Sequence, residues 1–151
     1  MPRLRALAVT GSLLTAVLAS EAFGDETAAL VDISGTWSIS VRDRADCTFA
    51  GQATLLPTDN PAAYTAHLTM RHDCPEFGGA AIAVQKSDVS VLGKQVSVRS
   101  TIVEFPSGFS ASYAPDDFAL TIQSPNRMFG IQTDRYGRLP AEWVRQESGI
   151  S

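Results

Sequence analysis

Short stretches in which apolar and polar residues alternate fill most of this chain, and they constrain its fold more than any other feature. In the first such stretch, Trp37, Ile39 and Val41 fall on one face, and serine or arginine falls on the other. A period of two residues is typical of a β-strand with one buried face. No segment shows the apolar stripe of a helix a dozen residues long. The alternation therefore predicts an all-β protein.

Turn-forming residues separate these stretches at intervals of 8 to 15 positions. The two-residue Gly93-Lys94 turn is typical of a β-hairpin, and a second strong turn signal lies at 57–61. We expect eight or nine strands, depending on whether the polar residues 85–88 interrupt one of them. The expected strands span residues 34–42, 47–56, 64–70, 80–84, 89–92, 95–105, 118–123, 127–133 and 141–146. Consecutive antiparallel strands favour a meander that closes on itself, because closure removes exposed edges. The sequence predicts an antiparallel eight-stranded up-and-down β-barrel.

The first 24 residues have the layout of a secretory signal. Arg3 and Arg5 form a charged start, and residues 6–19 form an uncharged run that is shorter than the ~20 apolar residues of a membrane span. The candidate cleavage sites follow Ala19, Ala22 and Gly24. We therefore expect a protein of the periplasm or a secreted protein, with no membrane insertion after cleavage.

Removal of 24 residues from a chain of 151 leaves 127, which is the size of one domain. We divide the chain into a signal peptide at 1–24, an N-terminal arm at 25–33, a β-barrel domain at 34–146 and a C-terminal tail at 147–151. At this length we expect one domain and not a two-domain enzyme with a cleft between domains. We expect a monomer.

The charge balance bears on possible partners. The whole chain has a net charge of −4, which becomes −5 without Arg3, Arg5 and Glu21 of the signal. Lysine occurs only at Lys86 and Lys94, and no basic run follows the signal. Binding to a phosphate backbone needs clustered basic residues, so we expect no nucleic-acid partner.

The two cysteines of the chain, Cys47 and Cys74, both lie in the mature part. An even number of cysteines in an exported chain predicts a disulfide. The bond would close a loop of about 27 residues, which stabilises the fold by restricting the unfolded chain.

Residues that could carry chemistry are few. His67 and His72 are five positions apart, so on one strand they point to opposite faces and fit a shared metal ion poorly. Asp116 and Asp117 could be a catalytic pair or a calcium loop, but after Pro115 we interpret them as turn chemistry and a negative edge. No set of nucleophile, histidine and acid is found. We expect a non-enzymatic protein with no catalytic residues, metal or cofactor.

Aromatic residues are the remaining candidates for a binding site. They either fill the core or line a ligand cavity. The set is Trp37, Phe49, Tyr64, Phe105, Phe109, Tyr113, Phe118, Phe129 and Trp143. The segment 106–114 is free of charge and contains a glycine. We therefore take Phe105, Phe109 and Tyr113 as a candidate rim for a ligand or a partner.

The opening of the first strand, Gly35-Thr36-Trp37, resembles the Gly-x-Trp motif of lipocalins and their calycin relatives. In that family the tryptophan closes one end of the barrel, and a basic residue of the last strand packs against it. The resemblance implies a barrel-closing motif of Gly35, Trp37 and Arg145. The segment 117–130 is also similar to the late hairpin of small bacterial lipocalin-like barrels. This resemblance implies a barrel that binds a small apolar or amphipathic ligand.

A second resemblance is to periplasmic inhibitors of serralysin-type metalloproteases. Those barrels share the Gly-x-Trp opening and have one cysteine about ten residues later and another one hairpin further on. Trp37, Cys47 and Cys74 follow that order, although the spacing of the cysteines is longer and the C-terminal half lacks the Trp and Gly pattern of that family. The resemblance implies the alternative function of a protease inhibitor acting through the arm at 25–33.

Overall fold

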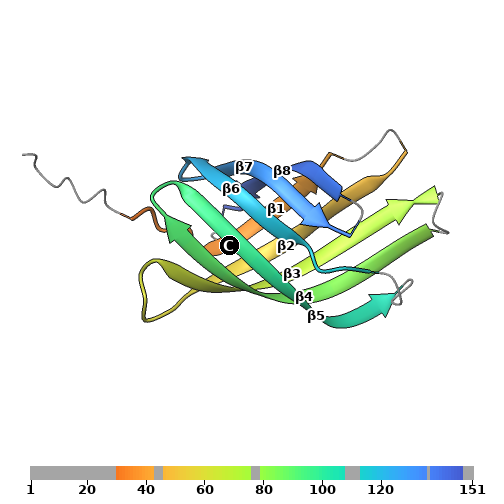
Figure 1. The fold of residues 1–151 in the computed structure, drawn as a ribbon, viewed down its shortest axis with the longest axis horizontal. Coiled ribbons are helices and arrows are strands. Elements are labelled where there is room, and N and C mark those ends of the chain that lie inside the picture. Colours follow the sequence, from red (N-terminus) through yellow and green to blue (C-terminus); the bar gives the residue numbers. More distant parts are fainter. Residues whose placement is uncertain (1–29, 43–45, 76–78, 108–112, 136, 148–151) are drawn as a thin grey trace, which may run out of the picture.

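The computed structural model describes residues 30–42, 46–75, 79–107, 113–135 and 137–147. In these residues eight strands follow one another around a closed barrel, each antiparallel to its neighbours, and the last strand pairs with the first (Figure 1). The strands are β1 (Gly35–Val41), β2 (Thr48–Pro57), β3 (Ala63–Cys74), β4 (Gly79–Leu92), β5 (Gln95–Ser107), β6 (Asp117–Ser124), β7 (Arg127–Asp134) and β8 (Gly137–Arg145). The predicted fold class, an antiparallel eight-stranded up-and-down barrel, is confirmed.

The alternation in the sequence decides which side chains fill the barrel. Trp37, Ile39 and Val41 of β1 are at most 6% exposed, whereas Ser38 and Ser40 between them face solvent. The same pattern continues around the barrel and produces one continuous apolar core. Burial of this apolar surface is the main driving force for closing the sheet.

Strand β4 differs from the prediction, because it runs without interruption where we expected residues 85–88 to separate two strands. Gln85 and Ser87 keep the alternation and point inward, where they are 0% and 5% exposed. Because these inward residues are polar, the alternation of apolar and polar residues that predicts a strand is interrupted at 85–88. The expected two-residue turn at Gly93 is present, and its φ of 60° suits glycine.

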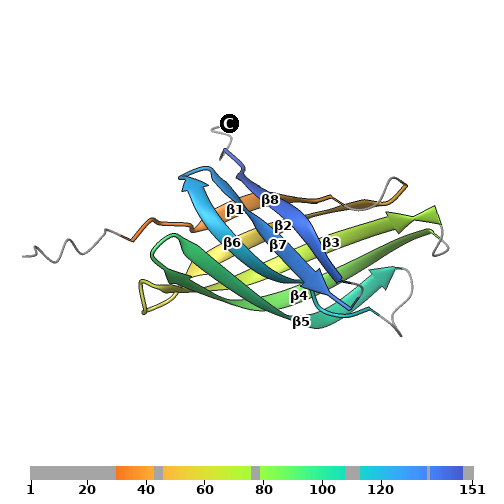
Figure 2. The ribbon, with the colours of Figure 1, turned by 45° about the horizontal axis from the view of Figure 1, so that its top comes forward.

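The two ends of the barrel differ in construction. We call the end where β1 begins the base, and the opposite end, where β2, β4, β6 and β8 begin, the rim end. Strands β3, β4 and β5 have 12, 14 and 13 residues, whereas β6, β7 and β8 have 8, 8 and 9. The longer strands extend beyond the shorter ones at the rim end, on the right of Figure 2. One side of the wall is therefore taller than the other.

The wall is least continuous between β5 and β6. Four residues of β5, Gln95 to Val98, pair with β6, although β5 pairs with β4 almost throughout. Beyond Val98, the contact between β5 and the start of β6 is made by hydrogen bonds from the side chain and the backbone of Ser100. Its Oγ donates to the carbonyl oxygen of Asp116 at 2.6 Å, and its N–H donates to Asp117 Oδ1 at 2.8 Å. We call this part of the wall the β5–β6 seam, and side-chain hydrogen bonds hold it in place of a backbone ladder.

Candidate functional site

The base of the barrel is filled by Trp37, whose side chain is fully buried. Its Nε1 donates to the carbonyl oxygen of Ile33 at 3.0 Å, and the guanidinium of Arg145 lies 4.6 Å from the ring centroid. Gly35 has a φ of 112°, and a Cβ there would lie 3.1 Å from Arg145 Nη1. The structure thus brings together Gly35, Trp37 and Arg145, the three residues that the lipocalin resemblance singled out.

The described end of the N-terminal arm packs on this base. Ile33 is 1% exposed within the core, and Val31 packs against it. Arg145 donates to the carbonyl oxygens of Ser34 and, at 2.8 Å, of Asp32. Residues 25–29, the first part of the arm, lie outside the described residues.

A groove of about 340 Å³ lies outside the base, between the arm and the turn that joins β2 to β3. It is lined by Leu30, Asp32, Ser34, Pro57, Thr58, Asn60, Pro61, Ala63 and Tyr64. Asp32, the charged residue of this lining, is exposed to solvent. Hydrogen bonds from Ser34 hold the pKa of Asp32 below its ordinary value. The groove therefore offers a solvated carboxylate rather than a buried polar group.

A buried polar cluster lies inside the barrel toward the rim end, around Asp116, which is 0% exposed. Its Oδ2 accepts hydrogen bonds from Gln85 Nε2 at 2.5 Å and from Tyr113 OH at 2.7 Å. Its Oδ1 accepts one from Gln132 Nε2 at 2.9 Å, and its backbone N–H donates to Gln85 Oε1 at 2.9 Å. Gln85 and Gln132 are also 0% exposed. We call Asp116, Gln85, Gln132 and Tyr113 the rim cluster.

The environment of Asp116 disfavours its charged form. Burial raises the pKa of Asp116 from 3.8 to about 6, and the charge of Asp134 acts in the same direction. The hydrogen bonds from Tyr113, Gln85 and Gln132 lower the pKa and offset part of this effect. Burial and the neighbouring Asp116 together raise the pKa of Tyr113 above its ordinary value, so its hydroxyl stays protonated and donates.

The sequence interpretation of Asp116 as turn chemistry at a negative edge is wrong. The two neighbouring carboxylates do point apart, and Asp117 alone faces outward, where it pairs with Arg99 at 3.1 Å. Asp116 lies two positions before Phe118, the first inward residue of β6, so the period of two already placed it inside. A polar residue between Pro115 and a strand is usually a turn residue, which concealed this signal.

Two of the three predicted rim aromatics, Phe105 and Tyr113, lie in one chain of ring contacts at the rim end. Phe49 and His72 have ring centroids 3.6 Å apart, His72 and Tyr113 5.6 Å, and Phe105 and Tyr113 5.6 Å. Phe109 lies outside the described residues. We call Phe49, His72, Tyr113 and Phe105 the aromatic wall, and its member Tyr113 also belongs to the rim cluster. The ring of His72 was not among the residues expected here.

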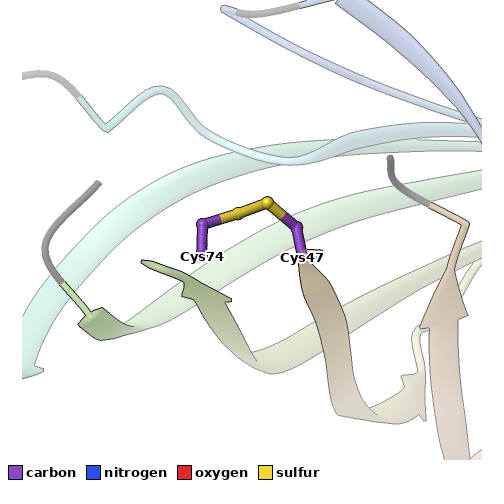
Figure 3. Close-up of a disulfide and its surroundings, with 2 residues drawn as sticks. All are labelled: Cys47 and Cys74. Carbon is purple, nitrogen blue, oxygen red and sulfur yellow. A yellow bond between two sulfur atoms is a disulfide. The ribbon is translucent and has the colours of Figure 1, made fainter. Parts of the chain in front are cut away.

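The predicted disulfide between Cys47 and Cys74 is confirmed, and it joins neighbouring strands at the rim end (Figure 3). Cys47 precedes β2 and Cys74 ends β3, with Cα atoms 4.4 Å apart. Two residues inward along each strand, Phe49 and His72 face each other in the β2–β3 register. The disulfide therefore fixes the two strands that carry the first pair of the aromatic wall.

Two buried polar atoms in the barrel interior have no hydrogen-bond partner among the described residues. One is Oε1 of Gln132, on the amide whose Nε2 donates to Asp116. The other is Nε1 of Trp143, whose ring meets Phe118 edge-on at 5.1 Å. A buried polar atom without a partner costs free energy, so a bound water, an ion or a polar group of a ligand would stabilise it.

The described residues lack two further features. They contain no group of three or more histidine, cysteine or acidic side chains arranged to hold a metal ion. His67 faces solvent and His72 lies on the inward side of β3, so these two do not meet. Nor does this part of the chain contain a helix long and apolar enough to cross a membrane.

The free energy of unfolding is expected to fall by about 2 kcal/mol between pH 4.5 and pH 7.5 because of Asp116. Folded Asp116 keeps its proton up to about pH 6, whereas the unfolded chain loses it near 3.8. The folded state therefore binds more protons in this window, and its stability decreases as the pH rises. Urea unfolding at several pH values measures the slope. Asp116→Asn should remove most of it, and the outward control Asp117→Asn should retain it; an unchanged slope in Asp116→Asn would contradict the assignment.

Solved structures with a similar fold include designed β-barrels. The redesigned barrel mFAP0, bound to DFHBI, has a TM-score of 0.56 and 18% identity, over 74% of this chain and 97% of its own. A de novo designed fluorescence-activating β-barrel has a TM-score of 0.56 and 16% identity, over 75% and 93% of the two chains. For mFAP1, also bound to DFHBI, the values are 0.54 and 15%, over 75% and 94%. The similarity is one of fold. The sequence matches no protein-family model and no curated protein.

Proposed function

We propose that this protein is an exported, non-enzymatic β-barrel that binds a small amphipathic molecule in the rim half of its interior. The observation that carries the proposal is the rim cluster, in which a buried carboxylate lies beside two buried amides and the oxygen of one amide, Gln132 Oε1, has no hydrogen-bond partner among the described residues. Ligand sites combine an apolar lining with a few convergent polar groups, and the rim cluster and the aromatic wall supply both.

The inward residues of β4 are smallest at its rim end. The base is filled by Trp37 and by large aliphatic residues such as Ile33 and Leu55, which are at most 1% exposed. Toward the rim end, the inward residues of β4 include Ala81 and Ala83, both 0% exposed. An eight-stranded barrel is just wide enough to hold one small ligand, so the size of the inward side chains decides how much room is left.

Two further observations support the proposal. The redesigned barrels mFAP0 and mFAP1, which are similar in fold, are bound to the small molecule DFHBI. Export is supported by the signal layout of residues 1–24 together with the disulfide, since disulfides persist in oxidising compartments.

Binding of the neutral apolar dye Nile red tests this function. The mature protein is expected to bind the dye at one saturable site, and Ala81→Phe should weaken the affinity at least about tenfold by filling the rim half. Ala80→Phe is the matched control, because Ala80 neighbours Ala81 on β4 but points outward. Circular dichroism would check that both variants fold. The absence of saturable binding, or equal binding by both variants, would contradict the proposal.

The alternative of protease inhibition through the arm stays a prediction. Val31 and Ile33 pack on the base, so an inserting segment would have to come from residues 25–30. An inhibition assay with and without residues 25–30 would test it, and inhibition that survives the deletion would exclude the arm as the inhibitory element.

A further inference from the structure

We infer that the rim cluster selects ligands that carry a protonated nitrogen on a flat apolar body. This inference rests on the proposed function, because it specifies the chemical class of the molecule that the barrel binds. Three features of the described residues carry it: the charge of Asp116, the open hydrogen-bond acceptors beside it, and the aromatic wall.

The charge of Asp116 has no cationic partner among the described residues. The three donors to its carboxylate, Gln85, Gln132 and Tyr113, are all neutral. The ion pairs of Arg71, Arg99 and Arg127 lie elsewhere, on partly exposed side chains. A buried charge is costly unless it is paired, so a cationic group on the ligand would complete this site. An anionic ligand would add a third negative charge to those of Asp116 and Asp134.

The rim cluster has two open acceptor positions. A carboxylate has about four acceptor positions, and Asp116 uses three of them for side-chain donors. The remaining position is on Oδ1, the oxygen that Gln132 contacts, and Oε1 of the same Gln132 has no identified partner. A single amide therefore links the two open acceptors. An ammonium group supplies three donors and no acceptor, which matches this arrangement.

The aromatic wall suits the rest of such a ligand. It reaches the rim cluster through Tyr113, whose hydroxyl donates to Asp116 while its ring contacts His72 and Phe105. Aromatic faces attract cations, and aromatic edges and faces pack well against flat rings. A protonated nitrogen bound at Asp116 would therefore place its apolar body against these rings.

The ionisation of Asp116 makes the selection depend on pH. The titratable and charged groups around it are Tyr113 on the preceding segment, Asp134 on β7, and His72 on β3, which contacts Tyr113. Asp117 and Arg99 lie on the outer side of the β5–β6 seam and pair with each other. β4 contributes the neutral Gln85. Protonation of Asp116 below its pKa of about 6 removes the negative charge that attracts the ligand.

Isothermal titration calorimetry on the mature protein at pH 7.5 tests the inference with matched probes. The indole series is tryptamine, 3-methylindole and indole-3-propionate, and the benzene series is benzylamine, toluene and benzoate. The amine of at least one series should bind at least about tenfold more tightly than its neutral and anionic analogues. Asp116→Asn should reduce this preference to within about twofold, and Asp117→Asn should retain it.

A wild-type pH series keeps the test decisive if Asp116→Asn does not fold. Between pH 7.5 and pH 5, amine affinity should fall about tenfold as Asp116 takes up its proton, while the affinity of the neutral analogue stays constant. Equal or tighter binding of the neutral or anionic analogues would overturn the inference. So would an amine affinity that is independent of pH, or binding of Nile red without binding of any amine. If Nile red also fails to bind, the proposed function itself fails.

Discussion

Replacement of Trp37 with alanine is expected to lower the free energy of unfolding by about 4 kcal/mol. The indole is 0% exposed, so its removal leaves a large cavity at the base of the barrel. It also removes the hydrogen bond to Ile33 and the ring that Arg145 covers, which together connect the arm to β8. Urea unfolding followed by circular dichroism measures the loss.

The matched control for this variant is Leu92→Ala, because Leu92 is 83% exposed at the β4–β5 turn. We expect that change to alter the free energy of unfolding by less than about 0.5 kcal/mol. A loss below about 2 kcal/mol in Trp37→Ala would show that the base collapses around the missing ring. The base would then not depend on Trp37 in the way described above.

The double replacement Cys47→Ser and Cys74→Ser is expected to lower the free energy of unfolding by about 3.5 kcal/mol. The bond closes a loop with a sequence separation of 27, and without it the unfolded chain gains conformational freedom. Chemical denaturation of the oxidised wild type and of the double variant measures the difference.

A reducing agent provides the internal control for the disulfide. It should lower the stability of the wild type to nearly that of the double variant and leave the double variant unchanged. Because Phe49 and His72 each lie two residues from a cysteine, the variant should also have a less ordered aromatic wall. Equal stability of the oxidised wild type and the variant would refute the stabilising role.

The features of the fold that follow from local pattern could be predicted from the sequence. Inward sets such as Trp37, Ile39 and Val41 and the turn at Gly93 are local, because each depends on neighbours only a few residues away. The pairing of Cys47 with Cys74 was predictable for another reason, since the chain contains no other cysteine.

The candidate site could be predicted only in part. Its aromatic members Phe105 and Tyr113 were expected, since a charge-free segment with exposed rings is a signal in itself. Its polar centre was missed, because Gln85 lies 31 positions before Asp116 and Gln132 lies 16 after it. The strands that face one another inside the barrel are determined by its closure. The role of a polar residue therefore cannot be predicted until the residues opposite it are known.

The β5–β6 seam places two demands on a single residue. Through its backbone, Asp116 accepts a hydrogen bond from Ser100 of β5 and donates one to Gln85 of β4. These bonds connect the residue that precedes β6 to both strands. Through its carboxylate, the same residue carries the charge on which ligand preference is proposed to depend. Because the structural bonds use only backbone atoms of Asp116, its side chain can change without removing them. The charge inside the barrel and the closure of its wall can therefore vary separately at one position.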